Sequence, residues 1–307
     1  WSAFVQPLAD AMERLSRAWG TVGHLHSVKD IPPWREAYNA ALPEVTGFYS
    51  DLGQNLALFR KYRAIRDGEE YTRLSPAQQR IIDNELRDFR LSGAELPEEQ
   101  KPRFKAIQEE LAALAAKFSE NLLDATNAFC ETITDERRLA GLPQDAKEAA
   151  RQVAEKAGVT GWRFTLQAPS FGPVMQYAED RALRARMYRA YATRASEFDD
   201  SGSKPEWDNT PLMRRLLELR AEEAGLLGYA HYAEVSLVAK MAESTQQVFS
   251  FLNELADRAK PFAERDMAEL RDFARTELGL DNLEPWDIAF ASEKLLQARY
   301  AFSEQEV

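Results

Sequence analysis

Hydrophobic residues recur every three or four positions along most of the chain, which is the spacing that gathers them on one face of an α-helix. The segment 208–242 shows this most clearly, because leucines recur up to Gly228 while arginines and glutamates cover the opposite face. A second set starts at Tyr229 and continues through Tyr232, Val235, Val238 and Met241. The pattern predicts two packed helices joined at a left-handed Gly228, with the second set continuing the buried stripe.

The same spacing predicts helices over most of the remaining sequence. These cover 2–22, 76–92, 104–125, 144–157, 174–178, 181–197, 244–279 and 285–300. Ser75 and Gln78 form a capping-box pattern at the start of one of them. In 30–66, Pro43 predicts either a kinked helix or two helices, and 168–173 reads as a loop.

Two short segments break the helical period. Residues 128–133 and 162–167 are rich in β-branched and aromatic residues, so we expect them to pair as a ribbon lying against the helices. The predicted fold class is therefore all-α, with many helices and one small two-stranded β ribbon near 128–167. We expect one helical region over 1–307; a subdivision into 1–127, 128–178 and 179–307 is the alternative organisation.

Composition narrows the class of partner. A net charge of −11 argues against nucleic acid or an anionic membrane surface, because phosphate contacts need clustered Lys and Arg. A single cysteine, Cys130, fits a reducing compartment, so a cytoplasmic location is the expectation. No apolar run approaches the roughly 20 residues of a membrane-spanning helix. The first residue is Trp1 rather than Met, so the absence of a targeting segment carries little weight.

Candidate chemistry is sparse. The three histidines are His24, His26 and His231, and an H-x-H metal site would need a third ligand because residues two apart face different sides of a helix. Structural histidines are the favoured interpretation, and Cys130, in an expected strand, is more plausibly inert than nucleophilic. The chain holds no H-E-x-x-H, P-loop, G-x-G-x-x-G or C-x-x-C motif. Composition and spacing alone predict no catalytic site.

Several stretches nevertheless resemble one peptidase family in order along the chain. They are LLELRAEEAGLLGYAHYAEVSLVAKMA followed by STQQVFSFLNEL, then HLHSVKD, FSENLLDAT with TDERRLAGLP, MYRAYATRAS and PWDIAFASEKLLQARYAFSEQEV. Together they are similar to the zinc metallopeptidases of the thimet oligopeptidase and neurolysin family, including its bacterial oligopeptidase A members.

This resemblance implies a fold and a chemistry. The fold would be the neurolysin-like N-terminal half of a helical molecule split by a deep channel that admits short peptides. Zinc would be held by two His of H-E-x-x-H and a later Glu, all at positions that the family places beyond Val307. We therefore expect no catalytic or metal residue here, zinc in the full-length parent but none in this fragment, and an inactive isolated chain. Expected partners are short peptides and the missing catalytic half.

The resemblance also suggests which residues approach the peptide channel. These candidates are Trp286, Asp287, Glu293, Arg299 and Tyr300, in the last predicted helix and just before it. Ordinary helix packing and solvated charge are the favoured alternative for them. A second hypothesis for the whole chain is a non-catalytic helical scaffold or protein-binding module. The gene sequence past Val307 would separate the two hypotheses, since only the peptidase needs an H-E-x-x-H.

Overall fold

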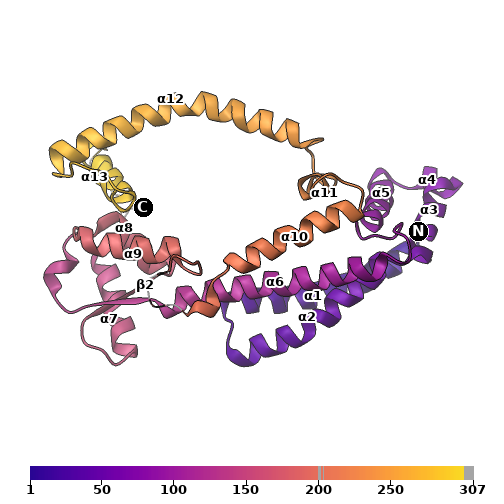
Figure 1. The fold of residues 1–307 in the computed structure, drawn as a ribbon, viewed down its shortest axis with the longest axis horizontal. Coiled ribbons are helices and arrows are strands. Elements are labelled where there is room, and N and C mark those ends of the chain that lie inside the picture. The colour runs from indigo at the N-terminus through magenta and orange to yellow at the C-terminus, as the bar shows by residue number, and fades with distance from the viewer. Residues whose placement is uncertain (200–201, 203, 301–307) are drawn as a thin grey trace. The chain divides into compact units, whose positions relative to one another are not determined.

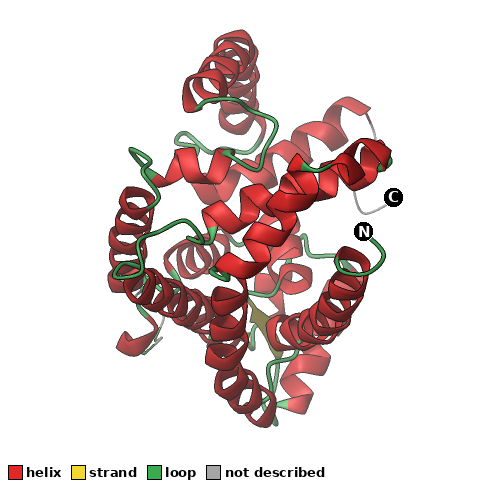
Figure 2. Ribbon diagram, turned by 90° about the vertical axis from the view of Figure 1, so that its right-hand side faces the viewer, coloured by secondary structure: helices red, strands yellow, loops and turns green. Residues whose placement is uncertain are grey.

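The computed structural model describes residues 1–199, 202 and 204–300. Over these residues the chain forms thirteen α-helices, three short 3-10 helices and two β-strands. Figure 2 shows how far helices predominate, with the two strands as a small feature among them. The predicted fold class, all-α with one small ribbon, is confirmed.

The helices follow one another with short connections, as labelled in Figure 1. The first six are α1 (Val5–Val28), α2 (Pro32–Gly53), α3 (Leu56–Asp67), α4 (Glu69–Arg73), α5 (Pro76–Leu91) and α6 (Lys101–Ala128). After the first strand come η1 (Glu136–Leu139), α7 (Gln144–Lys156), α8 (Ala168–Tyr177), α9 (Arg181–Thr193), η2 (Pro205–Trp207) and α10 (Thr210–Leu226). The last are α11 (Tyr232–Leu237), α12 (Thr245–Glu277), η3 (Pro285–Asp287) and α13 (Ile288–Tyr300).

The chain divides into two compact units. Unit 1 comprises Trp1–Glu120 with Leu212–Gln247, and unit 2 comprises the described parts of Asn121–Pro211 and Val248–Val307.

Unit 1 has an aromatic core built by its first helices. The buried residues are Val5, Phe59, Tyr62, Ile82, Leu86, Phe89 and Ala94. At the start of α5, the Gln78 backbone N–H donates to Ser75 Oγ at 3.3 Å and the Ser75 N–H donates to Gln78 Oε1 at 3.0 Å. The predicted capping box is confirmed, and it fixes where the helix that carries three of these core residues begins.

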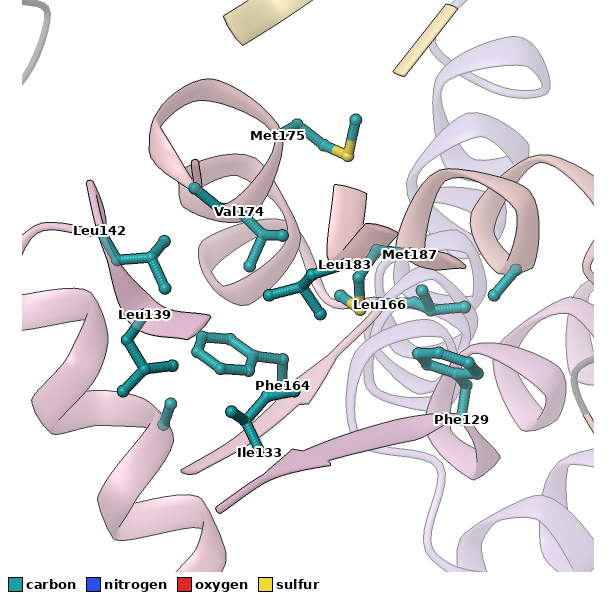
Figure 3. Packing of buried hydrophobic residues seen from close by; sticks show 13 residues of the cluster. Phe129, Ile133, Leu139, Leu142, Phe164, Leu166, Val174, Met175, Leu183 and Met187 are labelled. Atoms are coloured by element: carbon teal, nitrogen blue, oxygen red, sulfur yellow. The ribbon is translucent and has the colours of Figure 1, made fainter. Parts of the chain in front are cut away.

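Unit 2 is organised around the ribbon. Strand β1 (Cys130–Ile133) pairs antiparallel with β2 (Trp162–Thr165), so that Ile133 lies opposite Trp162. A ribbon of two strands is unstable alone, and here its inward side chains join a core supplied by α7, α8 and α9. Figure 3 shows the Phe164 ring among Leu139, Val174 and Leu183. The expected ribbon, lying against helices, is confirmed.

Three of the helices contain an internal proline. The predicted loop at 168–173 is wrong, because α8 runs from Ala168 to Tyr177 with Pro169 in its first turn and Pro173 inside it. Pro173 forfeits one backbone hydrogen bond, and burial of Val174, Met175 and Tyr177 offsets that loss. Pro43 lies inside α2, which excludes two helices divided at that proline, and Pro261 lies inside α12.

The hairpin at 208–242 is confirmed only in part. Gly228 has φ +81° and ends the first helix as predicted. The second helix, α11, is only six residues long, and the Lys240 N–H donates to the Leu237 carbonyl in a tight turn beyond it. Met241 is consequently 99% exposed, so the prediction that the buried stripe continues to it is wrong.

Candidate functional site

The five channel candidates lie in unit 2, in η3 and α13, but in different environments. Trp286 is partly buried, with its ring edge-on to Tyr188 at 6.2 Å between centroids. Asp287 and Glu293 are buried, whereas Tyr300 is 68% exposed. The Arg299 guanidinium forms an ion pair with Glu269 of α12 while its side chain stays 45% exposed. Only Arg299 and Tyr300 therefore present much side-chain surface to solvent.

Asp287 is the centre of a buried ionic network. Its carboxylate accepts hydrogen bonds from Arg181 Nη2 at 2.7 Å and from Arg184 Nη2 at 2.7 Å. The backbone N–H of Glu284 also donates to it, at 3.1 Å. Burial by itself would raise the pKa of Asp287, but these donors outweigh burial and hold that pKa below its usual range. The network ties η3 to the first turn of α9.

Arg184 is 1% exposed, and its surroundings leave it little freedom. Besides Asp287, it donates to the Ala178 carbonyl at 2.6 Å and to the Trp286 carbonyl at 3.2 Å. Its guanidinium carbon lies 4.1 Å from the centroid of the Phe290 ring. A buried guanidinium satisfied in this way fixes the position of the segment that precedes α13.

Glu293 is held by its own helix. Gln297 Nε2 donates to Glu293 Oε1 at 2.7 Å, and Glu293 is 3% exposed. Glu293 therefore presents little of its carboxylate to solvent.

The histidines His24 and His26 lie in different environments. His24 is exposed, while His26, in the last turn of α1, is buried in unit 1. His26 Nε2 lies 3.2 Å from Glu120 Oε1 and 3.5 Å from Asp30 Oδ1, and its ring stacks on Tyr38 at 4.0 Å. Burial, together with the Glu120 charge, raises the pKa of Tyr38. His26 thus acts as a packing and hydrogen-bonding residue.

A zinc ion does not fit the residues described. No group of three or more His, Cys, Asp or Glu side chains in the described part of the chain is arranged to hold a metal ion. His231 is exposed, 3.9 Å from Glu234, and Cys130 accepts a hydrogen bond from Arg163 Nη2 at 2.9 Å. No step of a metal-assisted reaction can therefore be assigned to these side chains.

Sequence reasoning did not identify Arg181 and Arg184 as partners of Asp287. They precede it by 106 and 103 positions, and an ion pair between distant helices leaves no periodic signal. The only local sign was Asp180, which caps α9 by accepting from the Leu183 N–H at 3.1 Å and so fixes where these arginines project.

Among the helices described, none is long and apolar enough to cross a membrane.

Comparison with known proteins gives consistent matches. Residues 1–101 match the model described as the neurolysin/thimet oligopeptidase N-terminal domain, and residues 174–307 match the model of peptidase family M3. The whole chain is 47% identical to oligopeptidase A of Haemophilus influenzae and 45% identical to that of Escherichia coli. It is 28% identical, over 297 residues, to a dipeptidyl carboxypeptidase of Salmonella typhimurium. The chain spans 45% of the length of the two oligopeptidases and 42% of the carboxypeptidase.

Proposed function

Because this chain belongs to peptidase family M3, the family of neurolysin and thimet oligopeptidase, we propose that it is the N-terminal, channel-forming part of a zinc-dependent oligopeptidase. The observation that carries this proposal is the match of the whole chain to two bacterial oligopeptidases A. The substrates proposed for the complete enzyme are short peptides, cleaved in the cytoplasm. The single cysteine supports that location.

In the complete enzyme, catalysis and substrate access would belong to different parts of the polypeptide. Zinc, its ligands and the general base belong to a catalytic part that carries H-E-x-x-H, a motif absent from these 307 residues. The present chain supplies one wall of the channel that receives the peptide. Alone, it is expected neither to bind catalytic zinc nor to cleave peptides.

An apolar stripe on α12 supports a large intramolecular partner. Phe251, Leu252, Leu255 and Phe262 lie at helical spacing and are each more than half exposed. A row of large apolar side chains in water is unfavourable and commonly marks an interface. We assign its cover to the catalytic part of the same polypeptide.

Within the channel wall, we propose that Arg299 and Tyr300 contact the peptide. Trp286, Asp287 and Glu293 would set the position of their helix from behind, as their burial and hydrogen bonds favour. An exposed phenol ring such as that of Tyr300 can pack on a peptide side chain and donate a hydrogen bond to its backbone.

Tyr300→Ala, made in the protein expressed from the complete gene, tests this assignment. We expect KM for a short peptide to rise by about 5- to 10-fold, equivalent to roughly 1–1.4 kcal/mol of lost binding, with kcat changing less than KM. Steady-state kinetics with a quenched fluorescent peptide measures both constants. Tyr49→Ala, at a partly exposed tyrosine of unit 1, is the matched control. Equal constants for Tyr300→Ala and the parent enzyme would remove Tyr300 from the channel.

The alternative is a non-catalytic helical scaffold or protein-binding module, and the exposed stripe of α12 is compatible with it. Sequencing the gene beyond the codon for Val307 discriminates the peptidase from the scaffold. An open frame that encodes H-E-x-x-H supports the peptidase. A stop codon directly after codon 307 supports the scaffold and overturns the proposal.

A further inference from the structure

Unit 1 contains an apolar groove between α6 and α10, with a volume of about 740 Å³. Both helices contribute to its sides, through Leu111, Ala115 and Phe118 on α6 and Met213, Leu216 and Leu217 on α10. Met213 is 44% exposed and Leu217 65% exposed, so the groove opens to solvent along an apolar edge. A concave, mostly apolar site of this size is typical of a ligand-binding site.

Two ion pairs join the helices that form the groove. Arg103 of α6 donates twice to the Glu222 carboxylate, at 2.6 and 2.5 Å. Arg215 of α10 donates to the Glu110 carboxylate at 2.6 and 2.9 Å. These two-point contacts between rigid guanidinium and carboxylate groups set the spacing of α6 and α10.

One end of the groove is polar and contains a carboxylate oxygen that lacks a hydrogen-bond partner. Glu223 lines it, is only 8% exposed, and accepts one hydrogen bond, from Gln108 Nε2 to its Oε1 at 3.0 Å. Its other oxygen, Oε2, is buried without a hydrogen-bond partner. Burial raises the pKa of Glu223, while Gln108 and the positive charge of Arg220 oppose that rise only in part. A buried carboxylate oxygen with no donor is a feature that proteins seldom keep without a reason.

Arg220 does not supply the missing donor. It also lines the polar end, but its guanidinium carbon lies over the Tyr232 ring, 5.0 Å from the ring centroid. The polar end therefore combines an unsatisfied carboxylate oxygen with a cation that is occupied on an aromatic face.

We propose that this groove binds the N-terminal segment of a peptide, whose α-ammonium pairs with the Glu223 carboxylate and whose apolar side chains lie against the leucines of α6 and α10. An ammonium matches the carboxylate in charge and offers three donors. Gln108 and Phe118 are ten helical residues apart, about 15 Å, which accommodates about four extended peptide residues. The site needs neither zinc nor peptide hydrolysis, so it stands independently of the proposed function.

Isothermal titration calorimetry of the 307-residue chain tests the ammonium contact with three peptides. The probes are Leu-Leu-Leu-amide with a free N-terminus, the same peptide N-acetylated, and N-acetyl-Lys-Leu-Leu-amide, whose only ammonium stands on a side chain. We expect the free N-terminus to bind at least about tenfold more tightly than the other two. Equal binding of the acetylated peptide would overturn the ammonium contact. Tighter binding of the lysine peptide would overturn the N-terminal assignment.

Two variants locate the binding event. Glu223→Gln should weaken the binding of the peptide with a free N-terminus by about tenfold and leave the binding of the acetylated peptide unchanged. Leu217→Asp, at a side chain that is 65% exposed, should weaken the binding of all three peptides. Glu99→Gln, at an exposed position outside the groove, is the matched control. Circular dichroism verifies that each variant is folded. Parent-like affinity in both groove variants, or no binding of any probe at millimolar concentration, would overturn the site.

Discussion

Asp287→Ala is expected to lower the free energy of unfolding by about 3–5 kcal/mol, because it leaves the buried Arg184 guanidinium without its counter-charge. The backbone carbonyls of Ala178 and Trp286 can still accept from Arg184, but they do not neutralise its charge. Arg181 loses the same partner, although its own side chain is 44% exposed and can be hydrated. The penalty therefore comes mainly from Arg184.

Urea unfolding followed by circular dichroism measures this change. Asp281→Ala, a few residues away at an exposed position, is the matched control and should change stability by less than about 0.5 kcal/mol. Similar losses in both variants would mean that the network around Asp287 does not carry the stability assigned to it.

The contribution of Asp287 to the stability of the protein should decrease at low pH. Since the pKa of Asp287 is lower in the folded state than in the unfolded chain, its stabilising contribution is complete above the unfolded value of about 3.9. That contribution is lost as the pH falls from there through the folded pKa. The difference in stability between parent and Asp287→Ala should accordingly shrink below about pH 4.

Phe164→Ala should cost about 3–5 kcal/mol of unfolding free energy, because the ring fills the centre of the unit 2 core and its removal leaves a cavity. Phe164 is 1% exposed and belongs to β2, one of only two strands in the described chain. Figure 3 shows that side chains from several different elements surround its ring, so the core cannot collapse by moving one helix.

The same urea measurement reports this loss, and Phe251→Ala is its control. Phe251 is 65% exposed on α12, so its removal should change stability by less than about 0.5 kcal/mol. A loss below about 1 kcal/mol in Phe164→Ala would show that the ribbon and its helices are loosely packed.

Local signals in the sequence predicted much of this fold. The capping box at Ser75 and the left-handed Gly228 fixed element ends, because both act through neighbouring residues. The predictions failed where distant packing decides. At 168–173, burial in the unit 2 core outweighed the proline signal. Beyond Leu237, the helical spacing continued in the sequence but the helix did not, and Met241 is 99% exposed.

The site residues divide in the same way. The family followed from matching stretches of sequence, but the roles of Asp287 and Arg184 depend on a contact across 103 positions, which spacing cannot reveal. The sequence did not predict the groove in unit 1, because the helical pattern around Glu223 indicates a glutamate exposed to solvent. Its burial and its unmatched oxygen arise only when α6 lies beside α10.

The central claim is that these 307 residues carry no catalytic zinc site and do not hydrolyse peptides by themselves. Its most direct test is hydrolysis of a quenched fluorescent peptide by the purified chain, stripped with a chelator and then supplied with zinc. We predict no turnover above the buffer rate and no stoichiometric zinc by atomic absorption. Turnover that appears with zinc and disappears in His26→Ala would contradict the claim and place a working metal site within this chain.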